Sequence, residues 1–232
     1  MPIYQKPTSD SARLAFLQEA KITAIADIAA GNPSISQATL DAITLFLPGF
    51  AEEIEAISIT LTGREKEVRE RNKAFATLET YLRDLWAGLV RRVHRQKEPA
   101  EVFTFYQLPL SGVMPQHLSK AEYLNIAKDV VRGDAHAVGA GYTPMSNPTV
   151  LELNAIIQSA EAEFDDVAVA DRDYDIAQEV VASSRTVAED FIQEVMDELR
   201  FALRKKEASS QRRIMRSYGA TYTFVEGEPE DA

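Results

Sequence analysis

The feature that most constrains this chain is a helical pattern that occurs twice at a nearly constant separation. Asn32-Pro33 precedes one long helix-forming stretch, and Asn147-Pro148 precedes another. In the second half of each stretch the apolar residues match in pairs that lie 110 residues apart: Leu82 with Ile192, Leu85 with Val195, Leu89 with Leu199 and Val93 with Leu203. A repeated helical pattern of this kind predicts a duplicated all-α architecture.

The predicted fold is an elongated all-α bundle of two similar tandem passes, each with a short helix and a long helical hairpin. The pattern divides the chain into an N-terminal extension (1–7), a first repeat (8–106), a linker (107–117), a second repeat (118–225) and a disordered acidic tail (226–232). The offset between matched positions varies from 107 to 115 residues. Insertions in loops explain this variation, because longer loops cost little entropy. Chance similarity between two amphipathic helices is the alternative.

Local signals indicate where the helices begin and end. Ser9 or Asp10 and, in the second repeat, Ser119 are suitable N-caps, because their side-chain oxygens accept hydrogen bonds from the free amides of a first turn. Gly31 fits the end of the first helix, since glycine adopts the left-handed conformation without a steric cost. Each repeat is therefore expected to open with a capped helix.

Several segments predict interruptions in the long helices. Pro48-Gly49 predicts a kink or a break. Thr62-Gly63 is typical of a tight turn, with a short break in one long helix as the alternative. Asp171–Asp173 lies at the equivalent position of the second repeat and suits a helix start. The last helix is expected to extend towards Ile214 and to stop at Tyr218-Gly219.

Two segments have the composition of short strands, Val102–Tyr106 and Thr221–Val225. Both alternate β-branched and aromatic residues, which are enriched in strands. The two segments are candidates for pairing with each other. Any sheet in the fold is therefore expected to be a small two-stranded element.

The long helices carry apolar residues at heptad spacing. Val68, Phe75, Leu82 and Leu89 recur every seven residues, which is typical of a coiled-coil seam. We expect six residues of the two long helices to be buried and to meet across the bundle: Leu82, Leu85, Leu89, Ile192, Val195 and Leu199.

Composition excludes several classes of function. The chain has 232 residues, no Cys and a formal net charge of −11. Disulfides, thiolate nucleophiles and zinc–thiolate sites are therefore excluded, and a negative surface opposes non-specific binding to nucleic acid or anionic membranes. The longest apolar run, Ala42–Ala51, is far short of the roughly 20 residues that a membrane-spanning helix needs. The N-terminus has no secretory signal, and a cytoplasmic location follows only by default.

Motifs that carry chemistry are incomplete. None of the three histidines (His94, His117 and His136) has a second ligand at helical spacing. Asp171, Asp173 and Asp175 resemble the start of a calcium loop, but Ile176 and Ala182 occupy the positions that require Gly and Glu. Gly139-Ala140-Gly141 lacks the flanking residues of a phosphate loop, and Ser183 and Ser184 have no assignable base. We therefore assign no catalytic, cofactor-binding or metal-ligating residue.

Two kinds of charged cluster remain. The acidic clusters Glu52-Glu53-Glu55 and Glu161-Glu163-Asp165-Asp166 fit the solvated faces of helices, with a cation or acid–base site as the alternative. Basic residues collect near the ends of the long helices, where the helix dipole favours cations. They also form a candidate anion-binding patch that consists of Arg91, Arg92, Arg95, Arg204, Lys205, Lys206, Arg212 and Arg213. Tyr218, Tyr222 and Phe224 near this patch suit base stacking.

These observations predict a non-enzymatic structural or scaffolding protein that self-associates as a homo-oligomer or docks a protein partner. The positive support is the long amphipathic helices, which make good interfaces. A polyanion-binding or nucleic-acid-binding module that uses the basic helix ends is the first alternative. A bundle with a carboxylate-based metal or ligand site is the second.

Overall fold

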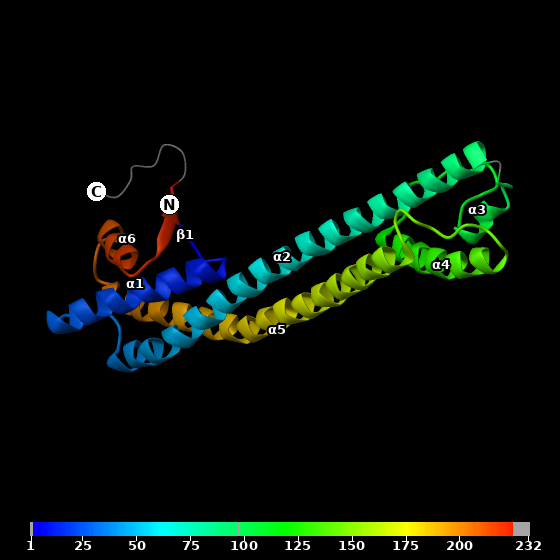
Figure 1. Cartoon of the computed structure of the whole chain (residues 1–232). Helices are drawn as coiled ribbons and strands as arrows, with labels where there is room; N and C mark the ends of the chain where they lie inside the picture. The colour runs from blue at the N-terminus through cyan, green and yellow to red at the C-terminus, as the bar shows by residue number, and fades with distance from the viewer. Residues whose placement is uncertain (1, 97, 225–232) are drawn as a thin grey trace. The chain divides into compact units, whose positions relative to one another are not determined.

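The computed structural model describes residues 2–96 and 98–224, and 76% of these residues are helical (Figure 1). Its described elements, in chain order, are β1 (Ile3–Gln5), α1 (Asp10–Ala29), α2 (Gln37–Gln96), α3 (Val102–Phe105), α4 (Lys120–Gly139), α5 (Val150–Leu203), α6 (Ala208–Ser217) and β2 (Thr221–Thr223). The all-α class and the small two-stranded sheet are therefore confirmed. No helix in the described ranges has the length and apolar character that crossing a membrane requires.

The chain forms two compact units. The terminal unit comprises Met1–Leu61 and Asp173–Ala232, and the central unit comprises Thr62–Arg172. Each unit contains two shorter helices, α1 and α6 in the terminal unit and α3 and α4 in the central unit, beside part of α2 and part of α5. The order of the helices, short–long–short twice along the chain, agrees with the expected duplication, which itself stays a prediction. The predicted tail 226–232 lies outside the described residues.

The terminal unit begins with α1, whose N-terminus is capped as predicted. The Ser9 hydroxyl accepts a hydrogen bond from the Ala12 amide at 3.2 Å, which satisfies one of the free donors of the first turn. Gly31 follows the helix with a φ of +73°, a conformation that glycine adopts without strain. The helix therefore ends where the sequence predicted.

The core of the terminal unit lies between α1, the first part of α2, the last part of α5 and α6. Its largest fully buried side chains come from α1, α2 and α5 and from the residue that follows α6: Leu17, Ile43, Phe50, Ile192, Met196, Leu199 and Tyr218. Burial of such side chains contributes roughly 1.5–3 kcal/mol each. The last helix does not run on to Ile214, as the pattern predicted, because α5 ends at Leu203 and α6 begins at Ala208.

The two-stranded sheet joins the N-terminal segment to the end of α6. In this antiparallel pair Ile3 lies opposite Thr223 and Tyr4 opposite Tyr222, and the two tyrosine rings are 5.9 Å apart. The expected strand within Thr221–Val225 is confirmed for Thr221–Thr223, while Val225 lies outside the described residues. The expected partner was wrong, because β2 pairs with β1 in the predicted N-terminal extension.

The segment Val102–Tyr106 is not a strand. Val102, Phe103 and Tyr106 are all buried, and this spacing places them on one side of a helical turn rather than on one face of a strand. Backbone bonds from the amides of Val102 and Phe103 to carbonyls three residues earlier close the turn. The β-branched and aromatic composition therefore reflects burial and not an extended backbone.

The predicted breaks in α2 and α5 are also wrong, whereas a kink at Pro48 stays a prediction. Pro48 and Thr62-Gly63 lie inside α2, and Asp171–Asp173 lies inside α5. A proline or glycine in a helix costs roughly 1–3 kcal/mol, which the packing of helices of 60 and 54 residues tolerates. Asp171 does not cap a helix but forms an ion pair with Arg64 of α2 in the central unit.

The six residues of the expected seam are all buried, between 0% and 3% exposed. They do not meet as predicted. Leu82, Leu85 and Leu89 belong to the core of the central unit, whereas Ile192, Val195 and Leu199 belong to the core of the terminal unit. Each long helix contributes its C-terminal half to a different unit, so the matched residues are buried in two separate cores.

Candidate functional site

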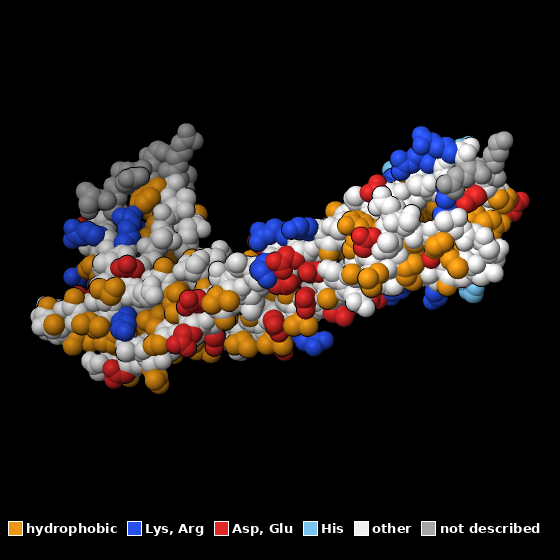
Figure 2. Space-filling view, in the orientation of Figure 1, with side chains coloured by type: hydrophobic (Ala, Val, Ile, Leu, Met, Phe, Trp, Pro, Cys, Tyr) orange, Lys and Arg blue, Asp and Glu red, His pale blue; other side chains and the backbone are white. Residues whose placement is uncertain are grey.

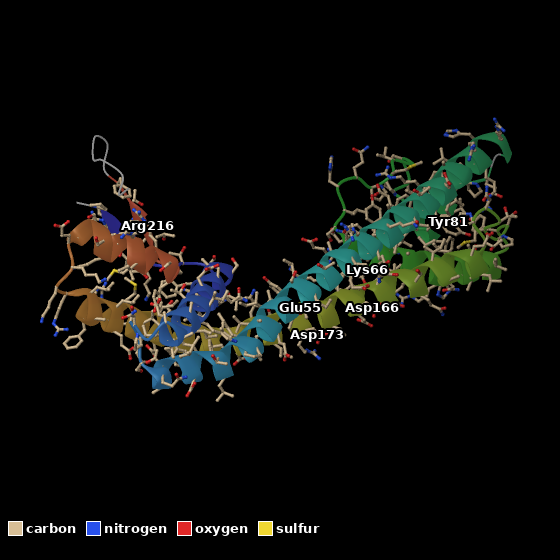
Figure 3. The ribbon with its side chains drawn as sticks, turned by 90° about the vertical axis from the view of Figure 1, so that its left-hand side faces the viewer. Glu55, Lys66, Tyr81, Asp166, Asp173 and Arg216 are labelled. Atoms are coloured by element: carbon tan, nitrogen blue, oxygen red, sulfur yellow. The ribbon has the colours of Figure 1, made fainter. Side chains whose placement is uncertain are left out.

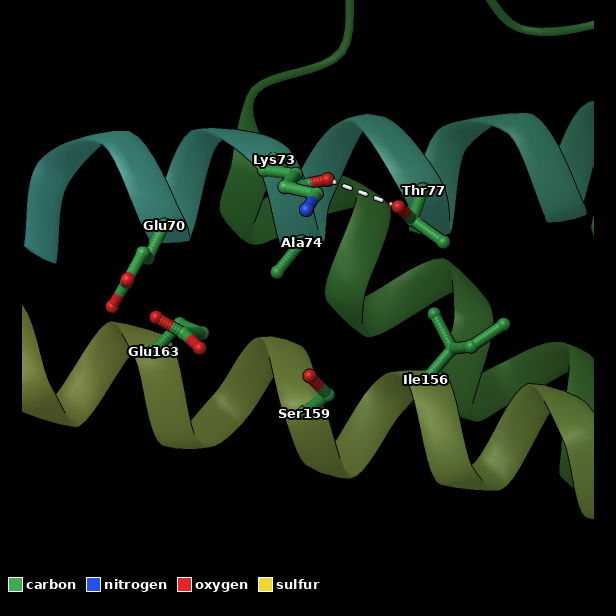
Figure 4. A pocket seen from close by; sticks show the side chains of 7 residues that line it. All are labelled: Glu70, Lys73, Ala74, Thr77, Ile156, Ser159 and Glu163. Carbon is green, nitrogen blue, oxygen red and sulfur yellow. Dashed lines mark hydrogen bonds between the residues drawn. The ribbon is translucent and has the colours of Figure 1, made fainter.

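The acidic residues of the second predicted cluster lie on α5 in the central unit, where a shallow pocket opens beside Glu163. Figure 4 shows Glu163 of α5 and Glu70 of α2 directed towards each other across this pocket. Lys73, Ala74 and Ile156 also line it. One carboxylate oxygen of Glu163 is buried without a hydrogen-bond partner among the described residues.

Glu163 also belongs to a cluster of three carboxylates from α2 and α5. Oxygen atoms of Glu67, Glu163 and Asp166 lie within 4.8 Å of one another. Lys66 of α2, labelled in Figure 3, donates to Glu67 at 3.0 Å and approaches Glu70 at 3.2 Å. These hydrogen bonds raise the pKa of the lysine. A cationic side chain already neutralises part of this cluster. Sequence inspection found Glu163 and Asp166 but missed Glu67, because it lies on the other long helix.

The predicted anion-binding residues are divided between the two units. Arg91, Arg92 and Arg95 lie near the end of α2 in the central unit. Arg92 is mostly buried, with its side chain 13% exposed, and its guanidinium donates to Glu98 at 2.8 Å. Arg91 is exposed and its Nε donates to the Ala87 carbonyl of its own helix. Of these three described arginines, Arg91 and Arg95 are exposed to solvent.

The other five predicted residues surround the junction of α5 and α6 in the terminal unit. Arg204, Lys205, Lys206 and Arg213 are exposed, whereas Arg212 is partly buried. Figure 2 shows basic side chains beside α6. The segment 200–216 contains seven Lys or Arg residues and one acidic residue, Glu207. It therefore carries strong positive charge within an acidic protein.

An exposed aromatic side chain lies at this basic junction. Phe201 is 68% exposed although it is among the largest apolar residues. The guanidinium of Arg204 lies 4.0 Å from the centre of its ring, and Arg204 also donates to the Phe201 carbonyl. This cation–π contact fixes the arginine over one face of the ring. We call Phe201 and Arg204 the aromatic knob.

A second surface of the terminal unit is apolar with an acidic border. A groove of about 450 Å³ is lined by α2 and α5. Small residues (Gly49, Ala56 and Ala177) and apolar residues (Ile176 and Val180) line it together with Glu52, Glu53 and Asp173. No basic residue is among these lining residues. We call this surface the acidic groove.

Buried tyrosines bind carboxylates in both units. Tyr106 donates to Asp134 at 2.7 Å in the central unit, and Tyr218 donates to Asp27 at 2.6 Å in the terminal unit. Burial, followed by the hydrogen bond to the carboxylate, raises the pKa of both phenols. These bonds link the residue after α3 to α4 and the residue after α6 to α1, so they hold the short helices together. The sequence held no local signal for them, because the partners lie far apart in the chain.

The remaining motif residues occupy ordinary helical or turn positions. All three histidines are exposed. Gly141 has a φ of +91° at the end of α4, as expected for a connector. The Ser183 hydroxyl donates to the Val180 carbonyl of its own helix at 2.9 Å. Asp173 and Asp175 both lie inside the continuous helix α5 and not in a calcium-binding loop.

Comparison with known proteins gives no relative. No protein-family model, no curated protein and no solved structure matches this chain.

Proposed function

We propose that this chain is a non-enzymatic structural or scaffolding protein that associates with other copies of itself. The observation that carries the proposal is a line of exposed apolar side chains on α5 in the terminal unit. Ile176, Val180 and Val187 are 52%, 47% and 41% exposed. Their spacing of four and seven residues places all three on one face of the helix.

The outer surface of α2 supports the same proposal. Leu45 is 85% exposed and Ile59 is 63% exposed in the terminal unit. Scattered apolar residues are common on protein surfaces, but aligned ones on a long helix are typical of helix-in-groove or bundle interfaces. A second helix can cover such a line without any change in the core.

Light scattering over a wide range of protein concentration tests this function. We expect a mass that rises above that of one chain, and we expect Val187→Lys to lower it because a charge would be buried in the interface. Thr186→Lys is the matched control, since Thr186 is exposed on another face of the same helix. A chain that stays monomeric at high concentration would contradict the proposal.

A second candidate function is binding to a polyanion at the junction of α5 and α6. The exposed Arg204, Lys205, Lys206 and Arg213 favour it, while the net charge of −11 opposes it. Binding of a fluorescent oligonucleotide at low salt tests this candidate. Affinity must fall steeply with added salt, because phosphate contacts release counterions, and Lys205→Glu must weaken it more than Lys120→Glu in the central unit.

A further inference from the structure

We propose that the acidic groove of one molecule receives the aromatic knob of a second molecule. This inference rests on the proposed self-association and names the two surfaces that would make it. Both surfaces lie in the terminal unit, and neither has a partner among the described residues that would cover it.

The groove has the chemistry of a receptor for a cationic aromatic group. Ile176 and Val180 are about half exposed, so they provide apolar surface that remains in contact with water. Glu52, Glu53 and Asp173 border it without a basic residue in the lining. Figure 3 shows Asp173 on α5 and Glu55 on α2 in this part of the terminal unit.

Glu53 gives an independent indication of a missing donor. Its Oε2 atom is buried and has no hydrogen-bond partner among the described residues. A buried carboxylate oxygen without a donor is costly. A lysine or arginine that enters the groove would donate a hydrogen bond to Glu53 and offset the negative charge of the bordering carboxylates.

The knob has the complementary chemistry. Phe201 supplies a large exposed apolar surface, and Arg204 already lies over one face of its ring. Lys205 and Lys206 follow directly and are exposed. Aromatic and arginine side chains are the residues that most often dominate protein interfaces, and opposite charges around them fix the orientation.

The positions of the two surfaces require a second molecule. Val180 and Phe201 lie on the same continuous helix, α5, 21 residues apart. At about 1.5 Å per residue this separation is roughly 30 Å. A helix that is packed in the core of the terminal unit cannot bend back over that distance, so the knob cannot enter the groove of its own molecule.

This contact is heterologous, since each molecule uses two different surfaces. A dimer formed this way leaves one groove and one knob free, so assembly continues until a ring closes or a filament forms. We therefore expect species larger than a dimer at high concentration. We also expect raised salt to weaken the assembly, because the bordering charges are at the surface.

Two complementary variants test the inference. The groove variant carries Glu53→Arg and Asp173→Arg, and the knob variant carries Phe201→Ala, Lys205→Glu and Lys206→Glu. Sedimentation equilibrium at low salt should show self-association weakened by about tenfold or more in each variant, as for the loss of a central interface residue. Glu55→Arg and Leu151→Ala are the matched controls, because both residues are exposed and lie outside the two surfaces.

An equal mixture of the two variants is the decisive sample. The intact knob of the groove variant meets the intact groove of the knob variant, so the mixture should form a one-to-one complex with nearly the affinity of the native contact. Recovery in the mixture also shows that both variants are folded. A mixture that associates no better than either variant alone overturns the inference.

Other outcomes separate this inference from the proposed function. If the native chain self-associates but neither variant changes its affinity, the surfaces are wrong and self-association stands. If only the groove variant loses association, the groove receives a different segment and the assignment of the knob is overturned. If the native chain is monomeric at every concentration, both proposals fail.

Discussion

In both the terminal unit and the central unit a tyrosine hydroxyl donates to an aspartate on a short helix, but the aspartate is buried to a different extent in each unit. In the central unit Asp134 is 4% exposed and accepts hydrogen bonds from the Tyr106 hydroxyl and the Met145 amide, both at 2.7 Å. In the terminal unit Asp27 is only partly buried and accepts from the hydroxyls of Tyr218 and Ser34. A buried carboxylate depends more strongly on its donors than a partly exposed one.

The backbone around the two tyrosines is also alike. The Leu108 amide donates to the Phe103 carbonyl at 3.0 Å, and the Ala220 amide donates to the Met215 carbonyl at the same distance. In both cases the residue after the tyrosine, Gln107 or Gly219, has a positive φ. The turns that follow α3 and α6 therefore share one backbone hydrogen bond and a positive φ after the tyrosine.

The largest loss of stability is expected at Gly133, where the backbones of α3 and α4 lie closest together. A Cβ added at Gly133 of α4 would lie 1.6 Å from the Phe105 carbonyl oxygen. Gly133→Ala should therefore force α3 away from α4 and destabilise the central unit by at least about 4 kcal/mol. Urea unfolding measures this loss.

Gly63→Ala is the control for that substitution. No atom lies within 4 Å of the Cβ that it would add, and alanine is favoured over glycine in a helix by about 1 kcal/mol. The control should therefore be neutral or stabilising. An equally small effect of Gly133→Ala would show that α3 does not lie against α4 at this residue.

Matched core leucines test whether the two cores contribute equally. Leu89 is 3% exposed in the central unit and Leu199 is 0% exposed in the terminal unit. Each Leu→Ala substitution should cost about 2–5 kcal/mol, because it removes a buried side chain and leaves a cavity. Leu85→Ala, in the same core as Leu89, should fall in this range too. A loss below about 0.5 kcal/mol, typical of surface sites, would show that the residue is exposed.

Removing the tyrosine hydroxyl should cost the two units different amounts of stability, and this difference should be smaller than the effects above. Tyr106→Phe removes a donor from a buried carboxylate and should cost about 1.5–3 kcal/mol. Tyr218→Phe should cost less, about 0.5–1.5 kcal/mol, because water and Ser34 can still solvate Asp27. Chemical denaturation of both variants at neutral pH measures the difference. Equal losses would show that burial of the aspartate does not set the cost.

The same tyrosines predict the dependence of stability on alkaline pH. Burial and the neighbouring carboxylate raise the pKa of Tyr106 and Tyr218 in the folded chain. Above about pH 10 the unfolded chain loses these protons while the folded chain keeps them, so the free energy of unfolding falls as the pH rises. The fall should be less steep in the double Phe variant, and an unchanged slope would contradict the assignment.

The sequence predicted the local ends of helices better than the breaks within them. The caps at Ser9 and Ser119 and the glycine after α1 were confirmed, because each depends on chemistry within a few residues. Thr62-Gly63 has the same local signals as a turn, but packing along a long helix outweighs them. Val102–Tyr106 was wrongly predicted as a strand because buried β-branched and aromatic residues are common both in strands and in buried helical turns.

The candidate surfaces were only partly visible in the sequence. The basic residues near Arg204 and the acidic residues Glu52 and Glu53 were identified as clusters of charge. Their combination with Ile176, Val180 and Asp173 in one groove depends on how α2 packs against α5, which periodicity alone does not determine. The exposure of Phe201 was likewise unpredictable, because its apolar character favours the core.

The smallest expected difference concerns the first turns of α1 and α4. The Ser119 hydroxyl accepts from the Glu122 amide at 3.3 Å, and Glu122 accepts from the Ser119 amide at 2.7 Å. Ser9 makes only the first type of bond, because Ala12 occupies the third position of α1. Ser119→Ala and Ser9→Ala should each cost about 1 kcal/mol, because each removes one side-chain cap, and Glu122→Ala should cost less because it removes only the second bond of α4.

The reciprocal bond also makes the cap of α4 sensitive to acid. The hydrogen bond from the Ser119 amide lowers the pKa of Glu122, so its stabilising effect is present above the carboxyl's ordinary pKa and is lost as the pH falls through the lowered value. Thermal unfolding of the native chain and of Glu122→Ala at neutral and acidic pH measures this dependence, because the substitution removes the acceptor while the Ser119 amide stays. The difference between them should shrink in acid, since protonated Glu122 no longer accepts the charge-assisted bond, and a constant difference would show that the charge of Glu122 does not contribute to the cap.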